Sequence, residues 1–204
     1  MSSRLGFPLI PLLIAVSLQA LAAPALARAD DNLLHGPHPF LKENDLSAHV
    51  LIASGIGDSM SGAKLAFDYG YRLTGGPIPM GLDLALNLQQ AACTHTGGGT
   101  ICGYDTGTLF ETLVGVRWKF RTPIPLVPYL VASGGLAFSF PNAADAALGP
   151  VGRVVAGANY FFFDWLGLGL QMGFSVGYLA YDDTFGGSHS YGVFDAGGGI
   201  EFQF

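Results

Sequence analysis

The chain has 204 residues, of which 50% are hydrophobic and 30 are glycines, and its mean hydropathy is +0.42. Its 15 acidic residues outnumber its 9 basic residues, so the protein is a poor candidate for binding nucleic acid. Beyond residue 29 no stretch approaches the roughly 20 consecutive apolar residues that a membrane-spanning helix needs. High hydropathy without such a stretch favours a barrel of strands.

The amino terminus has the pattern of a secretory signal peptide. Arg4 precedes an apolar run over 9–23 that closes on small residues. We expect residues 1–29 to be removed, with cleavage after Ala27 or Ala29. A retained membrane anchor is the alternative, but prolines in and beside the apolar run argue against it.

A single domain is expected over 46–204, after a polar periplasmic lead-in at 30–45. Apolar residues in this domain alternate with polar or small ones, which is the period of two that a strand with one apolar face requires. The third segment is the clearest, since four leucines alternate with Asp83, Asn87 and Gln89 among others. Eight segments show the alternation: 46–57, 62–73, 81–90, 108–121, 129–140, 153–163, 166–181 and 191–204.

The last segment, 191–204, ends on an aromatic residue. Its final six residues read Gly-Ile-Glu-Phe-Gln-Phe and resemble the carboxy-terminal signal that bacterial outer-membrane barrels present to their assembly machinery. Ile200, Phe202 and Phe204 are the apolar positions of this signal. A glycine-rich alternating strand can also end a soluble barrel, which is the alternative for this segment taken alone.

Across 46–204 the pattern resembles the small eight-stranded outer-membrane barrels of the OmpA transmembrane domain and OmpX type. The resemblance implies an all-β fold, an eight-stranded antiparallel up-and-down transmembrane β-barrel in the bacterial outer membrane. Outer-membrane lipid and the barrel-assembly machinery are the implied partners. The implied role is structural or in surface interactions, with a possible extracellular ligand bound through the loops. No cofactor or metal is expected.

The polar face of the strands carries the charged residues. Three cations share one face of segment 108–121, and each would cost about 2–4 kcal/mol if it pointed into lipid at the membrane midplane. We therefore expect a narrow lumen filled by side chains, in which opposite charges pair. Solvated charges in a wet lumen are the alternative. The predicted lumen charge network comprises Lys64, Asp68, Arg72, Asp83, Glu111, Arg117, Lys119, Arg153, Asp195 and Glu201.

Link lengths and aromatic residues give the barrel an expected orientation. Long links are predicted at the outer surface, at 91–107, 141–150 and 182–190, and shorter ones on the periplasmic side. Aromatic residues near the strand ends are expected to form girdles at the two membrane interfaces. The predicted girdle residues are Tyr71, Trp118, Phe120, Tyr129, Phe162, Trp165 and Tyr178.

Cys93 and Cys102 are the only cysteines and fall in the predicted outer loop 91–107. Because the chain is expected to be exported to an oxidising compartment, we predict a disulfide that stiffens this loop. A metal site that includes His95 is the alternative, although no further ligands stand nearby to complete it.

Two other functions stay open. The many inward glycines could leave a channel or a binding site for small apolar molecules, as in the OmpW type, and this needs an opening in the barrel wall or along its axis. Small barrels that modify lipid A use His and Ser near the outer face, and 188–190 reads Ser-His-Ser. We expect no enzyme, since only Asp182 and Asp183 could serve as carboxylate partners there.

Overall fold

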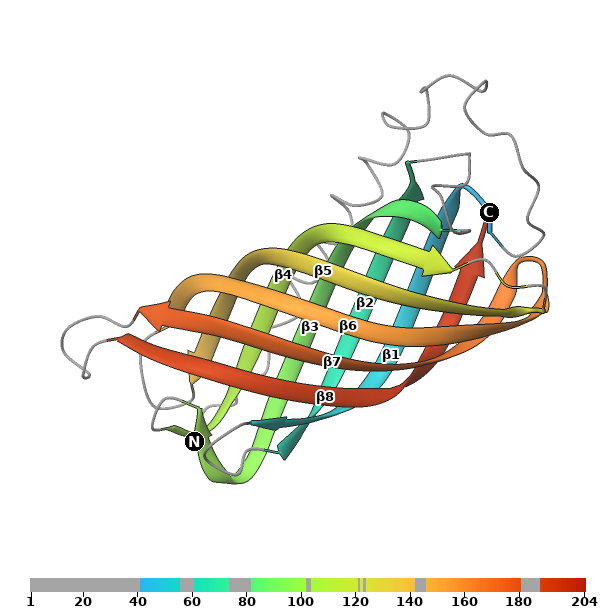
Figure 1. The fold of residues 1–204 in the computed structure, drawn as a ribbon. Coiled ribbons are helices and arrows are strands. Elements are labelled where there is room, and N and C mark those ends of the chain that lie inside the picture. Colours follow the sequence, from blue (N-terminus) through green and yellow to red (C-terminus); the bar gives the residue numbers. More distant parts are fainter. Residues whose placement is uncertain are drawn as a thin grey trace.

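The computed structural model describes residues 41–204 except 56–60, 74–81, 102–103, 121, 123, 142–145 and 181–187. Side chains also lie outside the description at 61, 82–83, 93–106, 141 and 188–189. The strands are β1 (Asn44–Gly55), β2 (Ser61–Arg72), β3 (Leu82–Ile101), β4 (Tyr104–Phe120), β5 (Leu126–Pro141), β6 (Ala147–Phe163), β7 (Leu166–Ala180) and β8 (Ser188–Gln203). Each pairs antiparallel with the next, and β8 pairs with β1 (Figure 1). The predicted all-β, eight-stranded antiparallel barrel is confirmed.

The apolar and the polar or small residues that alternate in the sequence lie on opposite faces of the barrel wall. Along β7, Leu168, Leu170 and Met172 are 51%, 72% and 57% exposed, whereas Gly169 and Gln171 between them are buried. Successive residues of a strand point to opposite faces, so one parity lines the lumen and the other faces outward. The outer face is therefore largely apolar. Within the described residues, the chain forms no helix with the length and apolar character needed to cross a membrane.

The largest difference from the sequence analysis is at the β3–β4 hairpin. Residues 91–107, predicted as a loop, are mostly strand. The ladder continues as far as Thr96 opposite Thr106, and Ile101 pairs with Tyr104 after a register shift. The many threonines in this stretch favour extended backbone, because β-branched side chains fit a pleated surface.

The predicted sorting of links by length is wrong. We call the end with the first residues of β1 and the last of β8 the turn end, and the opposite end the hairpin end. The links at the turn end span 73–81, 121–125 and 164–165, and those at the hairpin end span 56–60, 102–103, 142–146 and 181–187. The hairpin-end links are not systematically longer, because β3 to β6 extend into the segments predicted as long loops.

Most of the predicted aromatic girdle lies on the outer face. Phe162 and Trp165 are exposed at the turn end, and the ring of Trp165 stacks on those of Phe163 and Phe202 with centroids 5.7 and 6.2 Å apart. Tyr178 is exposed toward the hairpin end. Trp118 and Phe120 have outward parity on β4 and are half-buried.

Two predicted girdle residues are buried instead. Tyr129 is 2% exposed and lies in the lumen, because it has the parity of the inward residues of β5. Its hydroxyl donates to Gln171 Oε1 at 3.0 Å. Tyr71 has outward parity but is only 6% exposed, and it pairs with Asn44 at the start of β1.

The last strand closes the barrel between β7 and β1. Asn44 and Phe204 exchange two backbone hydrogen bonds of 3.0 Å. Ile200, Phe202 and Phe204 have outward parity and are exposed, so they form one apolar row on the outer face. Their recognition by an assembly machinery stays a prediction.

Candidate functional site

The barrel lumen gathers the buried charged side chains into two clusters. An eight-stranded barrel encloses an interior only wide enough for side chains, so inward residues from opposite walls can touch. The middle cluster lies about halfway along the strands. The turn-end cluster lies closer to the start of β1 and the end of β8.

The middle cluster joins Lys64 of β2, Glu111 of β4, Arg153 of β6 and Asp195 of β8. Lys64 Nζ donates to Glu111 Oε2 at 2.7 Å and to Asp195 Oδ2 at 3.1 Å. The two terminal nitrogens of Arg153 donate to the two carboxylate oxygens of Asp195 at 2.5 and 2.6 Å. Each of these four side chains is at most 2% exposed. Two cations face two carboxylates, so the cluster is neutral and closed to water.

The turn-end cluster is built on Arg117 and Lys119 of β4. Each donates to one oxygen of Asp45 at 2.7 Å. Lys119 Nζ also donates to Glu201 Oε1 at 2.9 Å, and Arg117 Nη2 lies 3.6 Å from Asp68 Oδ1. Three carboxylates therefore share two cations. The guanidinium carbon of Arg117 also lies 5.2 Å from the ring centroid of Tyr129, a favourable cation–π distance.

Apolar side chains fill the lumen on both sides of the charged clusters. At the turn end, Leu41 packs with Val127 and Phe161, and the Leu41 carbonyl accepts a hydrogen bond from Arg72 Nη1 at 3.1 Å. Among the described residues, apolar layers therefore flank the charged clusters, and the sequence analysis did not foresee these layers. The cluster at the hairpin end comprises Ala53, Leu109, Leu113, Ala137, Ala147, Val151, Leu179, Tyr191 and Val193.

Inward glycines give room to large side chains on neighbouring strands. Gly157 is opposite Tyr129, and a Cβ added to it would lie 2.5 Å from Tyr129 Cζ. A Cβ on Gly173 would lie 2.5 Å from Arg153 Nη2. Both distances are far below van der Waals contact, so at these two positions the absent side chain leaves no open cavity.

The structure brings all but two of the predicted lumen charges into the two clusters. Arg72 lies half-buried at the turn end, where it binds the Leu41 carbonyl. The side chain of Asp83 lies outside the described residues. The charges within the clusters are buried, which disfavours the alternative of a wet lumen with solvated charges.

Several residues that take part in the lumen network were left out of the predicted charge network. Asp45 was assigned to the lead-in, yet the odd-numbered inward series of β1 continues back to it. Asn159 donates to Glu201 Oε2, and Gln203 donates to Glu201 Oε1 at 2.8 Å. The Tyr191 hydroxyl lies 3.4 Å from a carboxylate oxygen of Glu111 in the middle cluster. Inward parity was the available signal for all of them.

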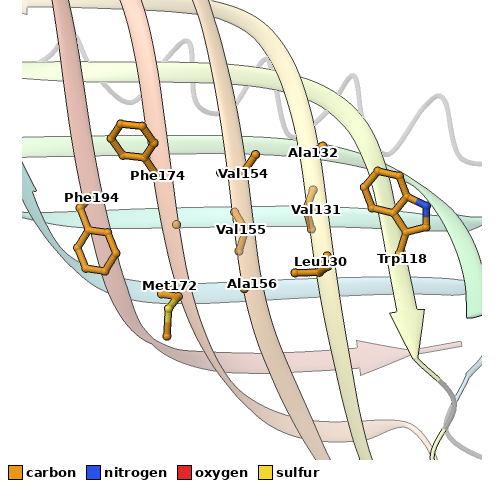
Figure 2. A pocket seen from close by; sticks show the side chains of 11 residues that line it. Trp118, Leu130, Val131, Ala132, Val154, Val155, Ala156, Met172, Phe174 and Phe194 are labelled. Atoms are coloured by element: carbon orange, nitrogen blue, oxygen red, sulfur yellow. The ribbon is translucent and has the colours of Figure 1, made fainter.

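The outer wall carries an apolar groove of about 370 Å³ that crosses β4 to β8 (Figure 2). Small side chains at its centre, Ala132, Val154 and Ala156, lie between bulky ones. These side chains have outward parity, so the groove lies outside the lumen and is no axial path. The bulky side chains are Trp118 and Leu130 on one side and Met172, Phe174 and Phe194 on the other.

Two predicted features of the hairpin end fall outside the described residues. Cys102 and the side chain of Cys93 are not described, so the disulfide stays a prediction. The side chains of Ser188 and His189 are not described either. Within the part of the chain that is described, no group of three or more histidine, cysteine or carboxylate side chains is arranged to hold a metal ion.

No family model matches the sequence, and no curated protein sequence matches it. Among solved structures, the barrel is similar to Neisserial surface protein A, with 16% identity, a TM-score of 0.57 and coverage of 79% of this chain and 96% of that chain. Two further structures align less closely, with TM-scores below 0.5. They are the outer membrane enzyme PagL (11% identity, 0.49, 78% and 99% covered) and the N-terminal barrel of Pseudomonas aeruginosa OprF (14%, 0.45, 79% and 100%). The chain has the fold of the small eight-stranded outer-membrane β-barrels.

Proposed function

We propose that the chain is an integral outer-membrane barrel with a closed lumen and a structural or surface-interaction role. The layered lumen carries this proposal. An ion on the barrel axis would meet an apolar layer, two clusters of tightly paired charges and a second apolar layer. Apolar constrictions exclude water, and the charges of the two clusters are largely bound to one another. The role then belongs to the outer wall and the ends of the barrel.

The outer face supports placement in a membrane. Val50 and Ile52 are 66% and 76% exposed, and Leu170 and Met172 on another strand are similarly open. Soluble monomers rarely expose contiguous apolar patches of this kind. Closure of the sheet also pairs each strand with two neighbours, so that no open sheet edge meets lipid. The signal peptide pattern and the fold support export to a bacterial outer membrane.

The hairpin end supports a surface-interaction role. The β3–β4 hairpin is a paired ladder as far as Thr96 opposite Thr106, which is a suitable base for presenting residues to an extracellular ligand. A disulfide between Cys93 and Cys102 would stiffen it further, mainly by constraining the segment between them. A search for an extracellular partner should therefore compare the wild-type barrel with variants that are altered in the β3–β4 hairpin.

Planar-bilayer conductance of the refolded, heat-modifiable protein tests the closed lumen. We expect no steady conductance, with the cysteines intact or reduced, while an open porin in the same bilayers serves as the positive control. A discrete conductance would contradict the proposal. Conductance only after reduction would mean that the hairpin gates a path, and transport would then be the better function.

The outer groove favours a second candidate, a binding site for small apolar molecules. Trp118 lines it, and Trp165, the other of the chain's two tryptophans, lies at the turn end. A brominated fatty acid added to the Trp165→Phe variant in detergent should quench Trp118 until about one molecule is bound per barrel. Filling the groove with Ala156→Phe should abolish this saturation. Equal, unsaturable quenching of Trp165 in a Trp118→Phe control would contradict a defined site.

We propose no catalytic role for the Ser-His-Ser segment at 188–190. Ordinary polar residues at a strand start account for it, and fold likeness alone gives no chemistry. Hydrolysis of lipid A by the purified barrel that is lost in His189→Ala would overturn this part of the proposal.

A further inference from the structure

The apolar groove on the outer wall extends from one depth of the barrel to another. One end is at Trp118, which lies on β4 between Arg117 and Lys119 of the turn-end cluster. The other end is at Phe194 on β8, which adjoins Asp195 of the middle cluster. Figure 2 shows these two side chains at opposite ends of the groove. The groove therefore leads from near the turn end to about halfway along the wall.

The strand register explains the shape of the groove. Leu130 is opposite Ala156, and Ala156 is opposite Met172, so a small side chain stands between two large ones in one row across the sheet. In the neighbouring row Ala132 on β5 is likewise small, and Phe174 on β7 is large. A chain that lies over the two alanines is therefore contacted from below and from both sides.

An acyl chain fits the groove in shape and in chemistry. The lining side chains are uncharged, and the volume of about 370 Å³ is in the range of known ligand sites. Acyl chains fill the hydrocarbon region of a membrane, and they make more van der Waals contacts in a groove than on a flat wall. Halfway along a membrane-spanning wall is the bilayer midplane, where the chains of each leaflet end. The depth of the groove thus matches a chain of one leaflet.

The indole N–H of Trp118 gives the groove a polar end. Among the described residues that line the groove it is the only side-chain hydrogen-bond donor, and it donates to no other described residue. Tryptophan at a membrane interface keeps its ring in the apolar region and its N–H at the polar boundary. A phospholipid has ester carbonyls where its chains join the headgroup, and such a carbonyl can accept this hydrogen bond. The headgroup then lies on the turn-end side.

We propose that the groove binds one acyl chain of a phospholipid from the leaflet on the turn-end side of the membrane. The ester carbonyl of that chain lies at Trp118, and its methyl end lies at Phe194. This inference rests on the proposed placement of the barrel in a membrane, and it names the occupant of the groove that was proposed above as a site for small apolar molecules. Such a molecule would bind there by displacing the chain.

Quenching of Trp118 by brominated phosphatidylcholine tests the proposal. The Trp165→Phe variant keeps Trp118 as its only tryptophan. It is folded in detergent micelles and titrated with phosphatidylcholine that carries bromine near the carboxyl end, in the middle or near the methyl end of one chain. The fluorescence should fall to a plateau at about one lipid per barrel. The fall should be largest with bromine near the carboxyl end.

A probe at the other end of the groove should reverse this order. Phe194→Trp is combined with Trp118→Tyr and Trp165→Phe, so that the only tryptophan lies at the level of the middle cluster. The tyrosine keeps a hydrogen-bond donor at the turn end of the groove. Bromine near the methyl end of the chain should then quench most strongly, because that part of the chain lies beside the probe.

Two alanine variants, each made in the Trp165→Phe background, separate the groove from the rest of the wall. Ala156→Phe fills the floor of the groove and should abolish the plateau. Ala48→Phe adds the same bulk to the outward face of β1, a strand that does not line the groove, and is the matched control. It should keep both the plateau and the order of quenching.

Vesicles made entirely of brominated phosphatidylcholine separate a failure of this inference from a failure of the proposed membrane placement. Both tryptophans of the wild-type barrel should be quenched in them. If neither is quenched, the membrane placement is wrong and the inference falls with it. If both are quenched in vesicles but Trp118 shows no plateau in micelles, the barrel lies in the membrane and the groove holds no lipid chain.

Three other results would overturn the inference while the membrane placement stands. A plateau that survives in Ala156→Phe would place the bound lipid elsewhere on the wall. Strongest quenching of Trp118 by bromine near the methyl end would contradict the assigned leaflet. Formation of a dimer that protects Trp118 from every brominated lipid would make a second barrel the occupant of the groove.

Discussion

Replacement of Asp195 by asparagine tests whether the middle cluster is held by paired charges. Asp195 is fully buried, accepts two hydrogen bonds from Arg153 at 2.5 and 2.6 Å and accepts one from Lys64 at 3.1 Å. In the variant, two buried cations share Glu111 as their remaining carboxylate. Breaking a buried ion pair on one side costs about 3–5 kcal/mol. The unfolding constant should therefore rise by roughly two to three and a half orders of magnitude.

Urea unfolding in lipid vesicles, followed by tryptophan fluorescence, measures this change. The surface pair of Lys42 with Asp164, 2.9 Å apart, provides a control, since Asp164→Asn should cost no more than about 1 kcal/mol. Adding Lys64→Met to Asp195→Asn leaves one cation and one carboxylate in the cluster. The double variant should therefore be more stable than the sum of its single changes predicts. An Asp195→Asn variant as stable as Asp164→Asn, or strict additivity, would refute the reasoning.

Three further predictions concern packing, closure and assembly. Gly157→Val should destabilise the barrel by about 1–3 kcal/mol in the same unfolding assay, because its Cβ would collide with Tyr129; an unchanged midpoint would contradict this. Leu41→Asp should leave bilayer conductance absent, because the hairpin-end cluster still closes the lumen, and conductance from this variant alone would mean that the hairpin-end cluster does not close the lumen by itself. Deletion of Phe204, whose side chain is 64% exposed, should slow assembly by the barrel machinery and leave unfolding of the assembled barrel nearly unchanged.

The strands were predictable because the period of two is a local property of the chain. Membrane or core placement does not alter it, so segments such as 166–181 matched β7 within a residue. The β3–β4 hairpin was not predictable in this way. Its residues beyond Gln90 are mainly threonine, glycine and small side chains, which have no apolar face to alternate. Backbone pairing with the partner strand, and not a face pattern, holds that part of the ladder.

Membership of the lumen could be predicted, but pairing within it could not. Parity identified Lys64, Glu111 and Asp195 as inward, yet the choice of partner depends on strand tilt and stagger, which are properties of the closed barrel. Tyr129 shows that the alternation of inward and outward residues, and not the distance from the strand end, decides whether an aromatic side chain faces the lumen or the lipid. It lies near a strand end, as a girdle residue would, but inward parity puts it beside Arg117. Leu41 precedes any periodic segment, so nothing local indicated that it would close the turn end.

The buried charges do more to specify the barrel than to stabilise it. A buried ion pair often contributes no more than a well-packed apolar pair of the same volume, because both ions lose their hydration. A shift of one residue in strand pairing, however, would turn every side chain to the opposite face. Lys64 and Arg153, about halfway along their strands, would then meet lipid at about 2–4 kcal/mol each near the midplane, with no carboxylate beside them. The ion pairs in the lumen therefore contribute mainly by destabilising shifted strand registers. The same alternation of inward polar and outward apolar residues is what allowed the strands to be predicted from the sequence.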